Sequence, residues 1–340
     1  MKLTILGAGS WGTALAAHFA GAGHEVMLWC RRPELAEELR RERRNAQFLP
    51  RTELPASLRV TADLNETLAA DAVLVVVPSH GYREVVRRYL RCVASTETRG
   101  ESVTLISATK GVETDTLERM SEVSRDEAAA ADREIRFAVL SGPNFAVELA
   151  AGAPTSAVVA ADSEEVATRL RERLSTPTFR LYSSTDVVGV ELGAASKNVI
   201  AIAAGIVAGL ELGHNALAAL MTRGLHEITR LVLAYGGQPR TLSGLAGMGD
   251  LVLTCTGPLS RNRSLGVKLA AGETLEAISA GTPMVAEGVR NSLAIARLAE
   301  QRQVEMPITE QMVEILYRDK PPTQAVRDLM ARELRPEAEL

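Results

Sequence analysis

The chain has 340 residues, 46% of them hydrophobic and 24% charged, with a formal net charge of -4 and an isoelectric point near 5.9. This composition is that of a globular protein long enough for two hydrophobic cores, and its acidic balance offers no basic surface for nucleic acid. Its three cysteines, Cys30, Cys92 and Cys255, are scattered and odd in number, and its five histidines have no ligand spacing. The sequence therefore predicts neither a disulfide framework nor a metal site.

The first half of the chain alternates short apolar strands with helices. Lys2–Leu6 and Glu25–Trp29 are β-prone, and Ala72–Val77 is a continuous apolar run, as in a strand covered on both faces of a parallel sheet. We expect further strands over 102–106, 135–140, 155–160 and 179–182, the last two at an edge, and helices over 13–22, 33–44 and 145–149. This alternation predicts a doubly wound α/β sheet, in which ligands gather at the carboxyl ends of the strands.

The strand pattern stops after about residue 186. A long apolar helix is expected over Val187–Leu210, and helical periodicity recurs over 217–235, 274–280, 289–300, 308–317 and 323–330. The sequence thus predicts an α/β domain over 1–186, an all-α domain over 187–332 and a frayed tail over 333–340.

A single lysine lies in a row of small residues along the helix expected over 187–210. Spaced by four, the row comprises Gly189, Gly193, Lys197, Ala201 and Gly205, so no neighbour in the row is large enough to cover Lys197. Burying a lysine without a partner is costly, and the cost is relieved by a lowered pKa or a bound anion. The alternative is a lysine that extends from a core helix to solvent.

Two segments have features of membrane signals. The N-terminal apolar run is interrupted by Gly7–Gly12, so we interpret it as folded structure rather than a signal peptide. The long helix has the length of a membrane span, but Glu191 and Lys197 would each oppose insertion. We therefore expect a cytoplasmic soluble protein without a membrane span.

Gly7, Gly9 and Gly12 form a G-x-G-x-x-G pattern between the first strand and the first helix. In the Rossmann fold these glycines allow a tight turn and a close approach to a pyrophosphate, whose charge lies at the helix N-terminus. The backbone N–H groups of Ser10 and Trp11 would then face the phosphates. The context of strand, turn and helix favours a dinucleotide site over a simple tight turn.

Arg31 and Arg32 stand about twenty residues after the last glycine, where NAD-specific folds place an acid for the ribose hydroxyl. Two guanidinium groups suit the additional phosphate of NADP, because arginine binds phosphate through paired donors. NADP(H) is therefore the favoured cofactor, and NAD(H) stays possible. The alternative is a solvated start of the next helix.

Further clusters follow strands or interrupt the helical half. Lys110 comes just after a buried strand, and Ser141–Asn144 (SGPN) follows another strand and precedes a helix, where its N–H groups can hold an anion. Gly244–Asp250 and Ser260–Arg263 form glycine-rich and basic stretches that we expect to be functional loops. Thr254 lies between them without an assigned role.

Taken together, these motifs resemble the NAD(P)-dependent sn-glycerol-3-phosphate dehydrogenase family in its bacterial form. They are GAGSWG from Gly7, ATKG around Lys110, SGPNFA at 141–146, ELGAASKNVIAI around Lys197, GLAGMGDLVLTC ending at Cys255, SRNR from Ser260 and VAEGV at 285–289. The resemblance implies a Rossmann domain followed by an α-helical domain of the 6-phosphogluconate dehydrogenase type. It also implies reduction of dihydroxyacetone phosphate to sn-glycerol 3-phosphate for glycerophospholipid synthesis.

The resemblance also implies roles for residues at matching positions. Lys197 would exchange the proton, Asp250 would hold Lys197, and Lys110 would touch both cofactor and substrate. The substrate site would comprise Lys110, Gly142, Asn144, Lys197, Asp250, Ser260, Arg261 and Asn262. Beside the three glycines, the nucleotide would contact Ser10, Trp11, Arg31, Arg32, Lys110, Ala146, Arg261, Val285 and Glu287.

In the reducing direction, the Lys197 ammonium would donate a proton to the carbonyl oxygen, its pKa lowered by burial and by Lys110. Arg261 and Asn262 would bind the substrate phosphate. Another two-domain reductase, of the β-hydroxyacid or ketopantoate type, is one alternative, although the SRNR cluster favours phosphate over carboxylate. A non-catalytic NADPH-sensing protein is the other. A homodimer is compatible with the sequence.

Overall fold

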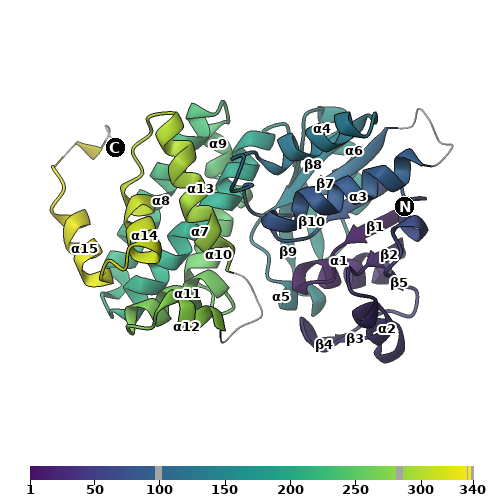
Figure 1. Cartoon of the computed structure of the whole chain (residues 1–340), viewed down its shortest axis with the longest axis horizontal. Helices are drawn as coiled ribbons and strands as arrows, with labels where there is room; N and C mark the ends of the chain where they lie inside the picture. The colour runs from purple at the N-terminus through teal and green to yellow at the C-terminus, as the bar shows by residue number, and fades with distance from the viewer. Residues whose placement is uncertain (96–101, 281–285, 335, 338–340) are drawn as a thin grey trace. The chain divides into compact units, whose positions relative to one another are not determined.

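The computed structural model describes residues 1–95, 102–280, 286–334 and 336–337. The chain divides into two compact units (Figure 1). Unit 1 comprises Met1–Lys110 and Glu118–Val187, and unit 2 comprises Gly111–Leu117 and Val188–Leu340. Unit 1 is α/β and unit 2 is helical, which confirms the expected fold class. Sequence reasoning did not foresee that 111–117 packs with the helical unit.

An eight-stranded sheet with the order β10-β9-β8-β7-β6-β1-β2-β5 organises unit 1. Its strands are β1 (Lys2–Leu6), β2 (Glu25–Trp29), β5 (Arg59–Thr61), β6 (Ala72–Val75), β7 (Val103–Ser107), β8 (Ile135–Ser141), β9 (Thr155–Ala161) and β10 (Phe179–Ser184). All neighbours pair in parallel except β8 and β9, which are antiparallel. The two strands expected at an edge, β9 and β10, do lie there, whereas β5 was not expected.

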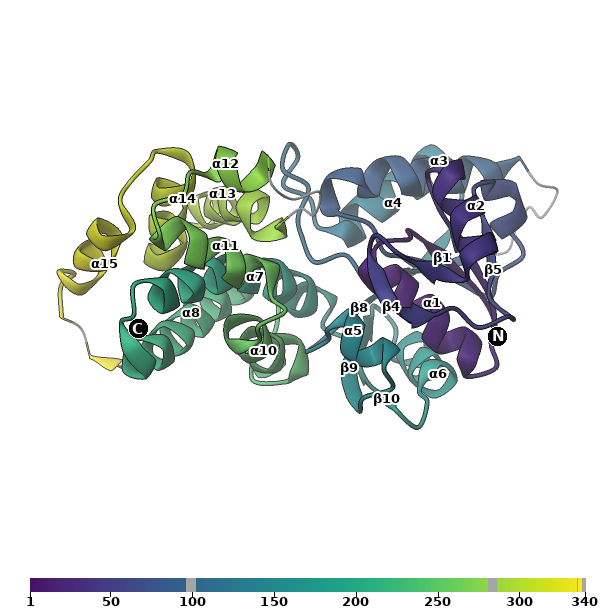
Figure 2. The same cartoon turned by 90° about the horizontal axis from the view of Figure 1, so that it is seen from below.

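Helices cover both faces of this sheet. They are α1 (Ser10–Gly21), α2 (Pro33–Glu42), α3 (Tyr82–Ala94), α4 (Met120–Ala130), α5 (Ala146–Ala150) and α6 (Glu164–Leu174), with 3₁₀ turns η1 (Leu64–Thr67) and η2 (Ser79–Gly81). Alternate strand residues such as Ile5, Leu28 and Ile106 share one core with α1 and α6. Helices α3 and α4 lie on the opposite face (Figure 2). The sheet is therefore doubly wound, as its apolar strands predicted.

The strand order reverses between β1 and β6. From β1 the chain proceeds to β2 on one side, and from β6 it proceeds to β7 and β8 on the other. Such a reversal leaves a crevice at the carboxyl ends of the two central strands, where dinucleotides bind in this fold. Gly7 directly follows β1 at this edge.

A two-stranded antiparallel hairpin, β3 (Arg44–Asn45) and β4 (Leu49–Glu53), stands apart from the main sheet. The expected helix over 33–44 ends at Glu42 instead, where Arg43 takes a left-handed conformation with φ 49°. This hairpin was not predicted because its strands are short and polar.

Ten helical segments build unit 2 among its described residues. They are α7 (Val187–Gly209), α8 (Gly213–Ala234), α9 (Pro239–Leu242), the π-helical turn η3 (Leu245–Gly249), α10 (Asp250–Thr256), α11 (Arg261–Ala270), α12 (Leu275–Ala280), α13 (Glu287–Gln301), α14 (Pro307–Tyr317) and α15 (Pro322–Met330). Of the tail expected over 333–340, residues 335 and 338–340 lie outside the described part.

Helix α7 is the core helix of unit 2. By length and composition it could cross a membrane, but 89% of its apolar window is buried inside the protein. Its glycines allow other backbones to come close: a Cβ on Gly205 would lie 2.0 Å from the carbonyl oxygen of Arg263, and one on Gly266 of α11 would lie 2.0 Å from that of Ile202. The small-residue row therefore serves as the crossing point of α7 and α11.

The prediction of loops over Gly244–Asp250 and Ser260–Arg263 is wrong. The first stretch is the turn η3 and the start of α10, and the second is the N-terminus of α11. The glycines of the first stretch are explained by packing, because a Cβ on Gly247 would lie 2.3 Å from the backbone of Leu242. Ser260 is the N-cap of α11, and its hydroxyl accepts a hydrogen bond from the N–H of Arg263.

Candidate functional site

Lys197 is buried near the middle of α7, with 5% of its surface exposed. Its Nζ donates hydrogen bonds to Asp250 Oδ1 at 2.6 Å and to Thr254 Oγ1 at 2.6 Å. The side chain therefore does not extend to solvent, and the burial expected from its small neighbours is confirmed. The cost of burying the ammonium is offset by a carboxylate that is itself 1% exposed.

The two partners of Lys197 come from one face of α10. Asp250 and Thr254 are four residues apart, so both side chains project from the same side of the helix. The Thr254 hydroxyl also donates to the backbone oxygen of Asp250 at 2.6 Å. It can therefore accept from Lys197 only in one orientation, which fixes the direction of the ammonium.

Asn262 connects three helices next to this ion pair. Its Nδ2 donates to Asn198 Oδ1 at 2.9 Å, and its Oδ1 accepts from the N–H of Gly288 at 3.0 Å. Asn198 follows Lys197 on α7, and Gly288 lies in the first turn of α13. A Cβ on Gly288 would lie 2.6 Å from the backbone oxygen of Asn198, so this junction requires glycine.

Arg261 and Glu287 begin α11 and α13, respectively. The Arg261 residue is partly exposed. Partial desolvation lowers the pKa of its guanidinium, while the nearby Glu287 carboxylate acts in the opposite direction. The N-terminus of α11 thus places a cation close to the buried Asn262 and to the start of α13. Val285, the remaining residue expected at this point, lies outside the described residues.

In unit 1, the glycine turn follows β1 as expected. Gly7 has φ +121°, and a Cβ there would lie 2.3 Å from the carbonyl oxygen of Val76. A Cβ on Gly12 would lie 1.9 Å from the oxygen of Gly7, so both positions require glycine. Gly9, the N-cap of α1, has no atom within 4 Å of its Cβ position, and no side chain caps the helix. The N-terminus of α1 is therefore open to an anion.

The other residues expected near a nucleotide surround this turn. Ser10 and Trp11 form the first turn of α1, and both are half-buried. Arg31 and Arg32 come one residue after the end of β2 and are exposed, with Arg32 as the N-cap of α2. Ala146 begins α5 and packs against the core of unit 1.

Lys110 lies after β7, and its Nζ donates to the backbone oxygen of Gly142 at 3.0 Å. Gly142 has φ +153°, and a Cβ there would lie 2.9 Å from the Cα of Ala157. Asn144 Nδ2 donates to the oxygen of Ser156 at 3.1 Å, whereas its Oδ1 is buried without a hydrogen-bond partner among the described residues. One of the two amide groups of this side chain is thus satisfied by the chain, and the other is not.

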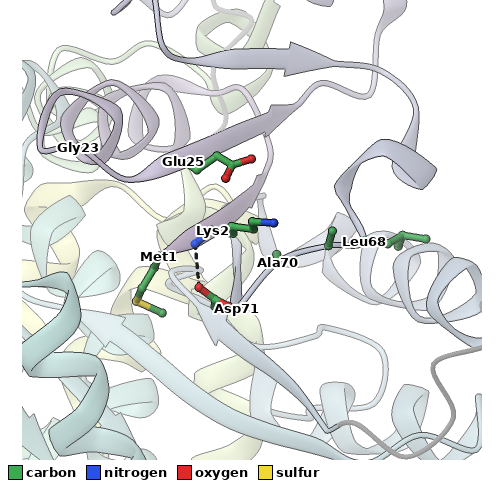
Figure 3. A pocket seen from close by; sticks show the side chains of 8 residues that line it. Met1, Lys2, Gly23, Glu25, Leu68, Ala70 and Asp71 are labelled. Carbon is green, nitrogen blue, oxygen red and sulfur yellow. Dashed lines mark hydrogen bonds between the residues drawn. The ribbon is translucent and has the colours of Figure 1, made fainter.

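A shallow pocket lies at the other end of the sheet (Figure 3). It is lined by Met1, Lys2, Gly23, Glu25, Leu68, Ala69, Ala70 and Asp71. Lys2 and Glu25 begin β1 and β2, so the pocket is at the amino ends of these strands, opposite the glycine turn. None of the expected site residues lines it.

Comparison with known proteins decides the family. A profile of the N-terminal part of NAD-dependent glycerol-3-phosphate dehydrogenase matches residues 2–167, and one of its C-terminal part matches residues 186–327. The chain belongs to the NAD-dependent glycerol-3-phosphate dehydrogenase family.

Similar family members cover almost the whole chain. It is 49% identical over 338 residues to a glycerol-3-phosphate dehydrogenase [NAD(P)+] of Nitratidesulfovibrio vulgaris, covering 99% of this chain and 100% of that protein. The protein of that name from Geobacter sp. (strain M21) is 49% identical over 337 residues, with 99% and 98% covered. The crystal structure of glycerol-3-phosphate dehydrogenase from Coxiella burnetii aligns with a TM-score of 0.91 and 39% identity over 97% of this chain and 99% of that one.

Ketopantoate reductases, one of the alternatives, share only the fold with this chain. A ketopantoate reductase from Ralstonia eutropha aligns with a TM-score of 0.58 and 16% identity, covering 96% of this chain and 100% of that one. The glycerol-3-phosphate dehydrogenase family is thus favoured over β-hydroxyacid and ketopantoate reductases and over a non-catalytic nucleotide sensor.

Sequence reasoning missed two residues that form hydrogen bonds with predicted site residues. Thr254 binds the Lys197 ammonium, and Asn198 binds Asn262. Thr254 was left without a role because its stretch was interpreted as following a loop. Its spacing of four from Asp250 would have revealed it, had the stretch been recognised as helical.

Proposed function

We propose that this family member reduces dihydroxyacetone phosphate to sn-glycerol 3-phosphate with NAD(P)H, for glycerophospholipid synthesis. The observation that carries the proposal is the ammonium of Lys197, buried and paired with Asp250 in the helical unit. A buried and oriented proton donor is what reduction of a carbonyl requires, because negative charge develops on its oxygen.

The residues of unit 1 fit the coenzyme. The open N-terminus of α1 and the close approach permitted at Gly9 suit a pyrophosphate, with Ser10 and Trp11 presenting the helix N–H groups. Arg31 and Arg32 favour NADP(H) through the additional phosphate, and NAD(H) binding is retained through the shared pyrophosphate. Ala146 and Lys110 are further proposed nucleotide contacts of unit 1, and Arg261, Val285 and Glu287 are those proposed for unit 2.

When bound, the reduced nicotinamide supplies a hydride to the carbonyl carbon of the substrate. The Lys197 ammonium donates a proton to the carbonyl oxygen, and in the reverse direction its amine accepts that proton. Asp250 favours the protonated form before the reaction and, with Thr254, fixes the direction of the N–H groups. Lys197, oriented by Asp250, is therefore a preorganised general acid in this proposal.

The remaining polar groups are proposed to bind the substrate. Arg261, with the backbone of Ser260 and the buried amide of Asn262, is suited to a phosphate at the N-terminus of α11. Asn262 uses one amide hydrogen and its oxygen internally, so it contributes its second N–H and orients the turn. In unit 1, Lys110, Gly142 and the unpaired oxygen of Asn144 are proposed to contact substrate hydroxyl or phosphate groups.

We further propose a cytoplasmic homodimer. The structure has free thiols at Cys30, Cys92 and Cys255, which suits a reducing compartment. Several large apolar side chains of the helical unit are exposed, among them Leu233, at 50%. Sedimentation of the purified protein tests the dimer.

A spectrophotometric assay tests the function. Purified protein with dihydroxyacetone phosphate should oxidise NADPH, and NADH less efficiently, whereas 2-keto acids should support no oxidation. Turnover of ketopantoate in place of dihydroxyacetone phosphate would contradict the proposal, and so would the absence of turnover with either coenzyme.

A further inference from the structure

The hairpin of β3 and β4 is fastened to the glycine turn by Asn45. This side chain is fully buried, and its Nδ2 donates to the oxygen of Ala8 at 3.0 Å and to Thr13 Oγ1 at 2.8 Å. Its Oδ1 accepts from the N–H of Phe48 at 3.1 Å. One buried amide therefore holds the glycine turn, α1 and the tip of the hairpin together.

A second bond closes this connection. The hydroxyl of Ser10, in the first turn of α1, donates to the backbone oxygen of Phe48 at 2.7 Å. The N–H of Phe48 is thus bound by Asn45 of the hairpin, and its oxygen is bound by Ser10 of α1. Gln47, which precedes Phe48, consequently has its backbone fixed relative to the proposed pyrophosphate site.

Gln47 in turn contacts Arg32. Its Oε1 accepts a hydrogen bond from Arg32 Nη2 at 2.5 Å. An exposed arginine otherwise samples many rotamers, so a hydrogen bond to Gln47, whose neighbour Phe48 is anchored to α1, favours one of them. Because the partner is a neutral amide, it orients the guanidinium without neutralising its charge. A carboxylate at this position would pair with that charge and would repel a phosphate.

We propose that Gln47 is a positioning residue that sets coenzyme preference, by holding Arg32 for the 2′-phosphate of NADPH. The inference rests on the proposed function and deepens it: the hairpin connects the pyrophosphate turn to the cation that distinguishes the two coenzymes. An acid near the ribose hydroxyls favours NAD in this fold, so a carboxylate beside Arg32 would shift the preference toward NADH.

The test is the ratio of the KM for NADPH to the KM for NADH in dihydroxyacetone phosphate reduction. Gln47→Glu should raise this ratio roughly 5-fold, the effect of an exposed ion pair of about 1 kcal/mol. The change should appear in KM rather than kcat, because Gln47 does not act on the reacting atoms. Gln303→Glu, at an exposed glutamine of the helical unit, adds the same charge and should leave the ratio at its wild-type value.

A double-mutant cycle tests whether Gln47 acts through Arg32. Gln47→Ala should raise the KM for NADPH in the wild-type background and should have no effect once Arg32 is alanine. The inference is overturned if Gln47→Glu leaves the ratio of the two KM values within 2-fold of wild type. It is also overturned if Gln47→Ala raises the KM for NADPH equally with and without Arg32. A wild-type protein that oxidises neither coenzyme would instead refute the proposed function.

Discussion

Substitutions in the ion pair between Lys197 and Asp250 should change stability and catalysis in separable ways. Its nitrogen and oxygen are 2.6 Å apart, and the two side chains are 7% and 1% exposed, so solvent screens the pair little. Asp250→Asn removes the compensating charge and leaves a buried ammonium, which should cost about 3–5 kcal/mol of unfolding free energy. Loss of the fixed ammonium direction should lower kcat on the order of 100-fold.

The assay is urea unfolding beside steady-state kinetics. Far-UV circular dichroism follows the helices, whereas both tryptophans, Trp11 and Trp29, lie in unit 1 and report that unit by fluorescence. The double variant Lys197→Met with Asp250→Asn has neither charge, so it should recover most of the lost stability but no activity. A double variant as unstable as Asp250→Asn alone, or an Asp250→Asn protein as stable as wild type, would refute the reasoning.

Three other predictions concern packing and protonation. Thr254→Val removes the hydroxyl that accepts a hydrogen bond from the Lys197 ammonium, and it should lower kcat about 10-fold. The control Thr256→Val, at an exposed position of the same helix, should leave kcat unchanged. Equal effects of the two variants would contradict the role of Thr254 in orienting Lys197. Gly205→Ala should destabilise by about 1–3 kcal/mol, since its Cβ meets backbone, while Gly21→Ala, with open space around it, should be neutral or stabilising in thermal unfolding. Burial raises the pKa of Glu227 from 4.5 to about 7, so the folded protein binds more protons between these values. Wild-type stability should therefore fall by up to about 3 kcal/mol as pH rises from 4.5 to 7, and Glu227→Gln, titrated in parallel, should lack this dependence.

The sequence predicted the parts of the fold that depend on local pattern. The apolar run Ala72–Val77 predicted a strand of the sheet, and the apolar periodicity of 187–210 predicted the helix that carries the row of small residues. The row left two alternatives for Lys197, burial against another element or extension to solvent, and the structure shows the first. The G-x-G-x-x-G turn was predicted because its glycines lie between a strand and a helix.

What the sequence did not predict depends on tertiary contacts. The stretch from Gly244 to Asp250 contains glycines, which usually indicate a loop, but here they allow a π-helical turn to pack against Leu242. The hairpin of β3 and β4 has polar strands without alternation, and the buried side chain of Asn45 and the hydroxyl of Ser10 attach it to the glycine turn and α1. No local pattern reveals such a long-range hydrogen bond.

The central claim is that the Lys197 ammonium supplies the proton. The most direct measurement is kcat for dihydroxyacetone phosphate reduction by Lys197→Met, which retains an unbranched apolar stem but has no ammonium, together with NADPH binding by fluorescence. The account predicts that kcat falls at least ~100-fold, the lower end of a general acid contribution, while NADPH still binds. Turnover at the wild-type rate in this variant would contradict the account.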